Sequence, residues 1–148
     1  MAEFPDADPP KAKNLLDFLA RLSRDSLAGC TACGKCVEAC PMPGYSRVLA
    51  GHAAPAIVEG VLQVLRGARG SEAALEWINL CTYSARCVPA CPEGVNPMLM
   101  LRVARMKAIG ALGDAPQLQR GRDKAYFRRV HAFSALQLED EEIESWQR

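Results

Sequence analysis

The chain has 148 residues, of which 49% are apolar and 24% are charged, and its formal net charge is +1. This length supports one hydrophobic core but not two. The near-neutral charge argues against a partner such as nucleic acid or an anionic membrane. No stretch approaches the roughly 20 apolar residues of a membrane-spanning helix, and residues 1–13 lack the apolar segment of a signal peptide. We therefore expect a cytoplasmic protein whose seven cysteines serve metal or redox chemistry rather than disulfides.

Apolar residues recur at helical spacing, and no convincing period-two run is found, so we predict an all-α fold. Residues that favour helix starts stand at suitable places: Asn14 with Asp17, Ser71, and Asn96 before Pro97. In chain order, the expected helices run from Asn14 to about Gly29, from Pro55 to about Gly67 or Gly70, from Ser71 to Leu80, from Met98 to about Gly110, and from Pro116 to about Val130.

The chain is expected to consist of three parts. Residues 1–13 form a flexible arm, residues 14–112 form the helical domain, and residues 113–148 form a C-terminal helix and a charged tail. Basic residues gather within 120–131 and acidic residues within 139–144. This charge segregation is compatible with two interpretations: a solvated surface helix with a frayed end, or a segment that docks on a protein partner.

A cysteine motif occurs twice, 51 residues apart. Residues 30–41 read CTACGKCVEACP and residues 81–92 read CTYSARCVPACP, which agree at seven of twelve positions. The one chemical difference is Ser84, which stands where the first copy has Cys33. The first copy has the C-x2-C-x2-C-x3-C-P spacing of bacterial-type iron–sulfur proteins, whereas a zinc site combines its ligands in one tetrahedral set. The sequence therefore predicts two iron–sulfur clusters.

The spacing within the first copy also predicts how the chain surrounds a cluster. Three cysteines at intervals of three wrap a tight loop that turns backbone N–H groups towards the sulfurs, and Gly34 permits a close or left-handed turn. Cys40 follows Cys36 by one helical turn, so its sulfur is displaced from that loop. It therefore suits the second cluster, as the fourth cysteine does in two-cluster ferredoxins. Pro41 then turns the chain away.

Exchange of the fourth cysteine between the two copies accounts for all seven thiols. Cluster one, a 4Fe–4S cluster, takes Cys30, Cys33, Cys36 and Cys91. Cluster two takes Cys40, Cys81 and Cys87, and its missing corner falls at Ser84. Two alternatives stay open for cluster two. It is either a 3Fe–4S cluster, which is the simplest account, or a 4Fe–4S cluster completed by Ser84, solvent or a ligand from a partner.

Several conspicuous side chains outside the motif have simpler expected roles. The histidines, His52 and His131, are expected at the surface or at caps rather than as ligands. The methionines near the motif are expected to pack and exclude water; they are Met42, Met98 and Met100. Trp77 is expected in the core, and Trp146, in a polar terminus, is expected to be an anchor for a partner.

The second copy resembles a known family. The stretch CTYSARCVPACPEGVNP is similar to the helical ferredoxin half of the iron–sulfur subunits of succinate dehydrogenase and fumarate reductase. There, C-x5-C-x3-C-P-x-G-x-N-P accompanies a three-iron cluster, and it is matched here by Cys81, Cys87, Cys91, Pro92, Gly94, Asn96 and Pro97. The resemblance covers roughly residues 14–110. It implies an alpha-helical ferredoxin, with a pseudo-twofold pair of cysteine loops and the same exchange of the fourth cysteines.

Those subunits also carry a plant-type 2Fe–2S domain, for which this chain has neither the length nor the cysteines. A stand-alone helical ferredoxin of this size is more similar to the small iron–sulfur subunit of heterodisulfide reductase. That family generally carries two 4Fe–4S clusters, from which Ser84 is a departure. The resemblance implies two protein partners, namely the cysteine-rich catalytic protein and the flavin-containing protein of such a complex.

We therefore expect an electron-transfer subunit rather than an enzyme, with no catalytic residue, no nucleic-acid partner and no transmembrane segment. Lys35 and Arg86 occupy equivalent positions in the two loops, where their charge would tune the cluster potentials. Two other classes stay open. One is an iron–sulfur enzyme whose open iron corner at Ser84 binds substrate. The other is a redox sensor that docks on a protein or nucleic acid.

Overall fold

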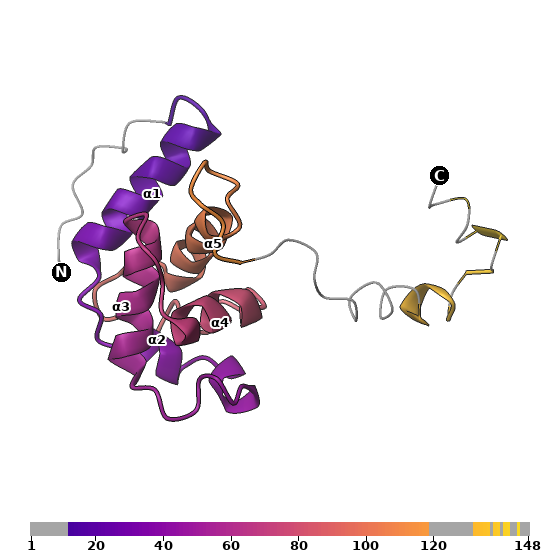
Figure 1. Cartoon of the computed structure of the whole chain (residues 1–148), viewed down its shortest axis with the longest axis horizontal. Helices are drawn as coiled ribbons and strands as arrows, with labels where there is room; N and C mark the ends of the chain where they lie inside the picture. Colours follow the sequence, from indigo (N-terminus) through magenta and orange to yellow (C-terminus); the bar gives the residue numbers. More distant parts are fainter. Residues whose placement is uncertain (1–11, 119–131, 137, 140, 143–144, 146–148) are drawn as a thin grey trace, which may run out of the picture. The chain divides into compact units, whose positions relative to one another are not determined.

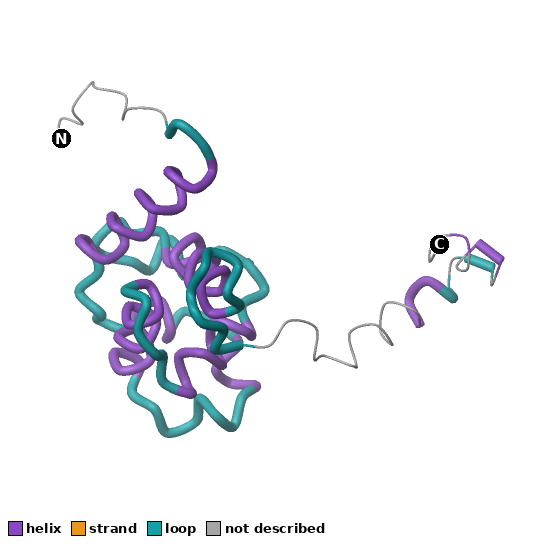
Figure 2. The backbone as a smooth tube through the Cα atoms, turned by 45° about the horizontal axis from the view of Figure 1, so that its top comes forward, coloured by secondary structure: helices purple, strands orange, loops and turns teal. Residues whose placement is uncertain are grey.

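The computed structural model describes residues 12–118, 132–136, 138–139, 141–142 and 145. The chain divides into two units, Met1–Leu118 and Gln119–Arg148. Helices and loops, without any strand, make up the described residues, as Figure 2 shows, and the expectation of an all-α protein holds for them. The first unit contains α1 (Leu15–Gly29), α2 (Lys35–Glu38), a 3-10 helix η1 (Met42–Tyr45), α3 (Ala54–Leu65), α4 (Glu72–Leu80) and α5 (Pro97–Ala108).

Three of these helices begin at the caps that the sequence predicts. The side chain of Asn14 accepts a hydrogen bond from the N–H of Asp17, at 2.9 Å, at the start of α1. Ser71 caps α4 in the same way, and Asn96 caps α5. Each such cap stabilises a helix by about 1 kcal/mol. Because capping depends on residues within one turn, these starts could be predicted from local sequence.

The core of the first unit is built around α3, which packs against both α4 and α5 (Figure 1). Val58 and Val61 of α3 are fully buried, as are Trp77 of α4 and Ala104 of α5. Gly60 lets α3 and α4 approach closely, since a Cβ there would lie 2.6 Å from the Cβ of Ala74. Trp77 is thus confirmed as a core residue.

The expected fifth helix does not begin at Pro116. Gln117 and Leu118 are not helical; their N–H groups donate to the carbonyl of Ala108 at 2.7 and 2.8 Å, beyond the end of α5. The side chain of Gln117 also joins the segment to the α3–α4 loop, through the N–H of Gly70 and the carbonyl of Ala68. These tertiary hydrogen bonds hold residues 117 and 118 in a non-helical conformation against the end of α5 and the α3–α4 loop, which local sequence does not reveal.

Several other expectations fall on residues outside the described ones. They concern the arm up to residue 11, the rest of the fifth helix, the basic stretch 120–131 with His131, and Trp146. In the second unit, Phe133 and Leu136 are exposed, as are Glu139, Glu141 and Glu142. None of the helices that the structure describes is long and apolar enough to cross a bilayer.

Candidate functional site

The two cysteine loops share an unusual backbone conformation. Ala32 and Tyr83, which are equivalent in the repeat, have φ values of 55° and 58°. Two residues further on, Gly34 and Ala85 have φ values of 86° and 61°. Among the described residues, every non-glycine residue with positive φ lies in these loops. Such conformations cost roughly 1–2 kcal/mol for a residue with a side chain, so their concentration here indicates a functional constraint.

Backbone hydrogen bonds repeat in the same register. The N–H of Val37 donates to the carbonyl of Gly34 at 2.9 Å, and that of Val88 donates to Ala85 at 3.0 Å. One step later, Cys40 donates to Val37 at 3.0 Å, and Cys91 donates to Val88 at 3.3 Å. The sequence repeat is therefore accompanied by a repeated local geometry. In the first loop these residues form α2, a short helix that spacing alone did not predict, whereas the equivalent residues of the second loop form turns.

The loops differ in what surrounds their second left-handed position. A Cβ on Gly34 would lie 2.8 Å from the backbone nitrogen of Pro55, because the start of α3 packs on this loop. Ala85 is exposed instead, so its methyl group is accommodated. The first loop therefore requires glycine on both steric and conformational grounds, as the sequence indicated.

This difference predicts opposite effects for two matched substitutions. Gly34→Ala is expected to destabilise the protein by about 2–3 kcal/mol, through the clash with α3 and the left-handed backbone. Ala85→Gly should stabilise it by about 0.5 kcal/mol, because relief of strain slightly exceeds the entropy gained by the unfolded chain. Anaerobic urea unfolding measures both. Destabilisation by Ala85→Gly would contradict the strain assigned to the second loop.

All seven cysteines lie in the described part of the chain, and none forms a disulfide. Cys36 and Cys87, equivalent in the repeat, are buried, whereas Cys33 is exposed and the other four are half-buried. Ser84 is exposed like its counterpart Cys33. Each loop thus places its second position at the surface and its third in the interior.

Charge interactions between thiolates show which cysteines are neighbours. Burial raises the pKa of Cys30, and the nearby thiolates of Cys91 and Cys33 raise it further. Burial likewise raises the pKa of Cys81, to which Cys40 adds, and the pKa of Cys87, to which Cys81 and Cys40 add most. The fourth cysteine of each copy is therefore a neighbour of cysteines in the other copy. Cys87 also interacts with Cys36 and with Cys91. The set formed by Cys30, Cys33, Cys36 and Cys91 therefore adjoins the set formed by Cys40, Cys81 and Cys87.

Backbone amides approach equivalent sulfurs in the two loops. Against the larger effect of burial, the N–H of Ala32 lowers the pKa of Cys30. In the same way, the N–H of Tyr83 lowers the pKa of Cys81. Amides that donate to a sulfur stabilise its negative charge, whether the sulfur is a bare thiolate or a metal ligand.

The metal-free protein should lose stability as pH rises above 9. Burial raises the pKa of Cys36 to about 12, ahead of the charges of Cys30 and Cys87. Between the ordinary pKa of 9.0 and about 12, the folded thiol keeps a proton that the unfolded chain has lost. The free energy of unfolding therefore falls with pH, by about 1 kcal/mol per unit from this group.

Urea unfolding at pH 8 and pH 10.5, with reductant and chelator, checks this expectation. The matched control is Cys36→Ser, since a serine hydroxyl does not titrate in this range and should flatten part of the slope. Equal slopes for the two proteins would contradict the burial effect.

Charged side chains from the helices also reach the loops. Arg105 Nη1 donates to the carbonyl of Asn79, at 2.9 Å, just before Cys81. Arg102, one turn earlier on α5, lies over the ring of Tyr83, with 5.3 Å between its Cζ and the ring centroid. These arginines were not singled out from the sequence. The signal that could have found them is a pair of arginines three residues apart on a helix whose only other charged residue is Lys107.

The spacing of the thiols distinguishes a site for one metal ion from a site for a cluster. Among the described residues, no three His, Cys, Asp or Glu side chains converge closely enough to bind a single metal ion. In an iron–sulfur cluster each thiolate binds a different iron, so the ligands stand further apart than around one ion. Soft thiolate donors, in two adjoining groups with amides near their sulfurs, fit this chemistry.

The other predicted residues lie as follows. His52 is exposed, Met100 is buried, and Met42 and Met98 are half-buried. Thr31 donates to Glu93, at 3.3 Å, which joins the first loop to the segment after the second.

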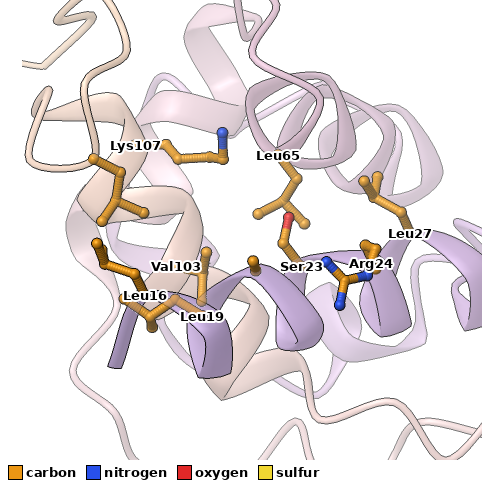
Figure 3. A pocket seen from close by; sticks show the side chains of 10 residues that line it. Leu16, Leu19, Ser23, Arg24, Leu27, Leu65, Val103 and Lys107 are labelled. Carbon is orange, nitrogen blue, oxygen red and sulfur yellow. The ribbon is translucent and has the colours of Figure 1, made fainter. Parts of the chain in front are cut away.

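A groove of about 420 Å³ lies apart from these thiols, between α1, α3 and α5 (Figure 3). Its lining is mostly apolar, as at Leu19, Leu65 and Val103, with Arg24 and Lys107 among it. No cysteine lines it, so it is not part of the thiol site.

No protein-family profile, curated protein or solved structure matches this chain.

Proposed function

We propose that this protein is an electron-transfer subunit, similar to the small iron–sulfur subunit of heterodisulfide reductase, with the fold of a helical ferredoxin. It would relay single electrons between a flavin-containing partner and a cysteine-rich catalytic partner, in the cytoplasm. The observation that supports this most is the pair of cysteine loops with the same backbone conformation. Each of these loops has its fourth cysteine beside thiols of the other.

In this proposal the cysteines hold two clusters. A 4Fe–4S cluster would be bound by Cys30, Cys33, Cys36 and Cys91, and a 3Fe–4S cluster by Cys40, Cys81 and Cys87. The clusters supply one-electron redox chemistry when bound. The chain itself buries two of the ligands, Cys36 and Cys87, and directs the N–H groups of Ala32 and Tyr83 towards sulfurs. No general base or nucleophile is needed.

The exposed positions of the loops favour exchange with partners. Cys33 and Ser84 are both exposed, so each ligand set has one ligand position at the surface. Tyr83 beside Ser84 is 40% exposed, and Lys35 and Arg86 are exposed at equivalent positions. A partner protein that docks at either exposed position would come close to a cluster. Electrons could then enter at one loop and leave at the other, without a substrate pocket.

Anaerobic purification with iron, sulfide and zinc analysis tests the proposal. About seven irons per chain are expected for one four-iron and one three-iron cluster, and about eight for two cubanes. EPR-monitored redox titration should then show two one-electron centres. Co-purifying proteins should include a flavoprotein or a cysteine-rich protein. A chain that holds only zinc, or no metal, would overturn the proposal.

A second candidate function is favoured by the exposure of Ser84. If cluster two has four irons, the iron at this corner would lack a thiolate and face solvent, where a substrate can bind. A change in the EPR or Mössbauer spectrum of the isolated protein on addition of a small thiol or disulfide would support an enzyme. An unchanged spectrum favours the electron-transfer function.

A further inference from the structure

The two sets of cysteines that would bind the clusters have different charged side chains around them. Arg105 is held beside the second loop by its hydrogen bond to the carbonyl of Asn79, and Cys81 follows two residues later. Its positive charge lowers the pKa of Cys81, against the larger effects of burial and of the thiolate of Cys40. Arg102 adds a second guanidinium on the same side of α5, over Tyr83.

The first loop has a paired charge nearby. Glu59 of α3 is close enough to Cys30 to raise the pKa of that thiol, after burial and the neighbouring thiolates. Its carboxylate is paired with Arg66, at 2.9 Å, and accepts a hydrogen bond from Gln63, at 2.8 Å. Because Arg66 offsets it, this carboxylate adds little net charge near the first set of cysteines, whereas the second set lies near Arg105.

We propose that Arg105 raises the reduction potential of the centre bound by Cys40, Cys81 and Cys87. This inference rests on the proposed function. A cluster gains one negative charge when it accepts an electron, and a fixed cation stabilises that charge.

The placement of Arg105 explains why its charge is effective. Its guanidinium is fixed by a carbonyl at the end of α4, so it does not swing away into solvent as an unbound arginine would. Arg105 is also half-buried, where screening by water is weaker than at the surface. Lys35 and Arg86, by contrast, are exposed and equivalent, so they provide no asymmetry.

The test compares Arg105→Gln with the parent protein by EPR-monitored redox titration, after iron and sulfide analysis of each sample. Loss of the charge is expected to reduce the equilibrium constant for reduction of the second centre about tenfold, which is about 59 mV for a one-electron couple. The first centre should keep its potential. Arg105→Lys, which retains the charge, should restore most of the shift.

Two further variants separate charge from structure. Lys107→Gln removes a cation from the same helix, but one that is paired with Asp114 at 3.1 Å, and should leave both potentials unchanged. Asn79→Asp adds an anion at an exposed site while it keeps the backbone carbonyl, so it should lower only the second potential even if Arg105→Gln does not fold.

The outcomes distinguish the two proposals. An unchanged second potential in fully loaded Arg105→Gln or Asn79→Asp overturns the role of Arg105 and leaves the electron-transfer function intact. Equal shifts of both centres, or failure of Arg105→Lys to restore the potential, also overturn it. Absence of iron and sulfide from the parent protein overturns both.

Discussion

Replacement of Cys91 by serine is expected to leave the first cluster with three thiolates, although Cys91 belongs to the second copy of the motif. Three thiolates hold three irons in the proposed second cluster, so iron should fall from about seven to about six per chain, and the four-iron EPR signal should be replaced by a second three-iron signal. The reason is that Cys91 is a neighbour of Cys30. Iron analysis and EPR of the anaerobically purified variant measure the loss.

Cys40→Ser is the matched control, since Cys40 is the equivalent residue of the first loop. Its loss should remove the second cluster and leave about four irons. If each fourth cysteine instead served its own loop, the two results would be interchanged: Cys91→Ser would retain about four irons and Cys40→Ser about six. This exchange of outcomes is what makes the pair decisive.

Ser84→Cys is expected to complete the second ligand set. The residues on either side, Tyr83 and Ala85, have the same left-handed conformation as the residues that flank Cys33, so a new thiol would take an equivalent place. Iron should rise from about seven to about eight per chain, and the three-iron EPR signal should disappear. A serine hydroxyl does not provide this ligand, because it ionises far less readily than a thiol.

Thr82→Cys is the control for that gain, as it adds a thiol to the same exposed loop at a position where neither copy has a cysteine. It should leave the iron content unchanged. About eight irons in the parent protein, with no increase in Ser84→Cys, would show that the second centre is already a cubane and would favour a solvent or partner ligand.

Local features of the fold could be predicted from sequence because they depend on neighbouring residues. The caps Asn14, Ser71 and Asn96 each accept a hydrogen bond from the residue three positions later. The start at Pro116 was wrong: residues 117 and 118 are not helical, and the side chain of Gln117 bonds to groups 47 and 49 residues away. The residues near Pro116 in the sequence do not indicate which distant groups Gln117 contacts.

The candidate site likewise combines features set by local sequence with features set by the packing of distant segments. The sequence by itself determined the number and spacing of the thiols and the repeat that relates the two loops, because these are properties of short stretches. The tertiary structure decided that position 34 requires glycine while position 85 accepts alanine, because α3 packs only on the first of these. Only the tertiary structure decided that α5 brings Arg105 to a carbonyl 26 residues away, and that Glu59 of α3 is near Cys30. Long-range charge arises from the way helices pack, and helix packing is set by the whole buried core rather than by any motif.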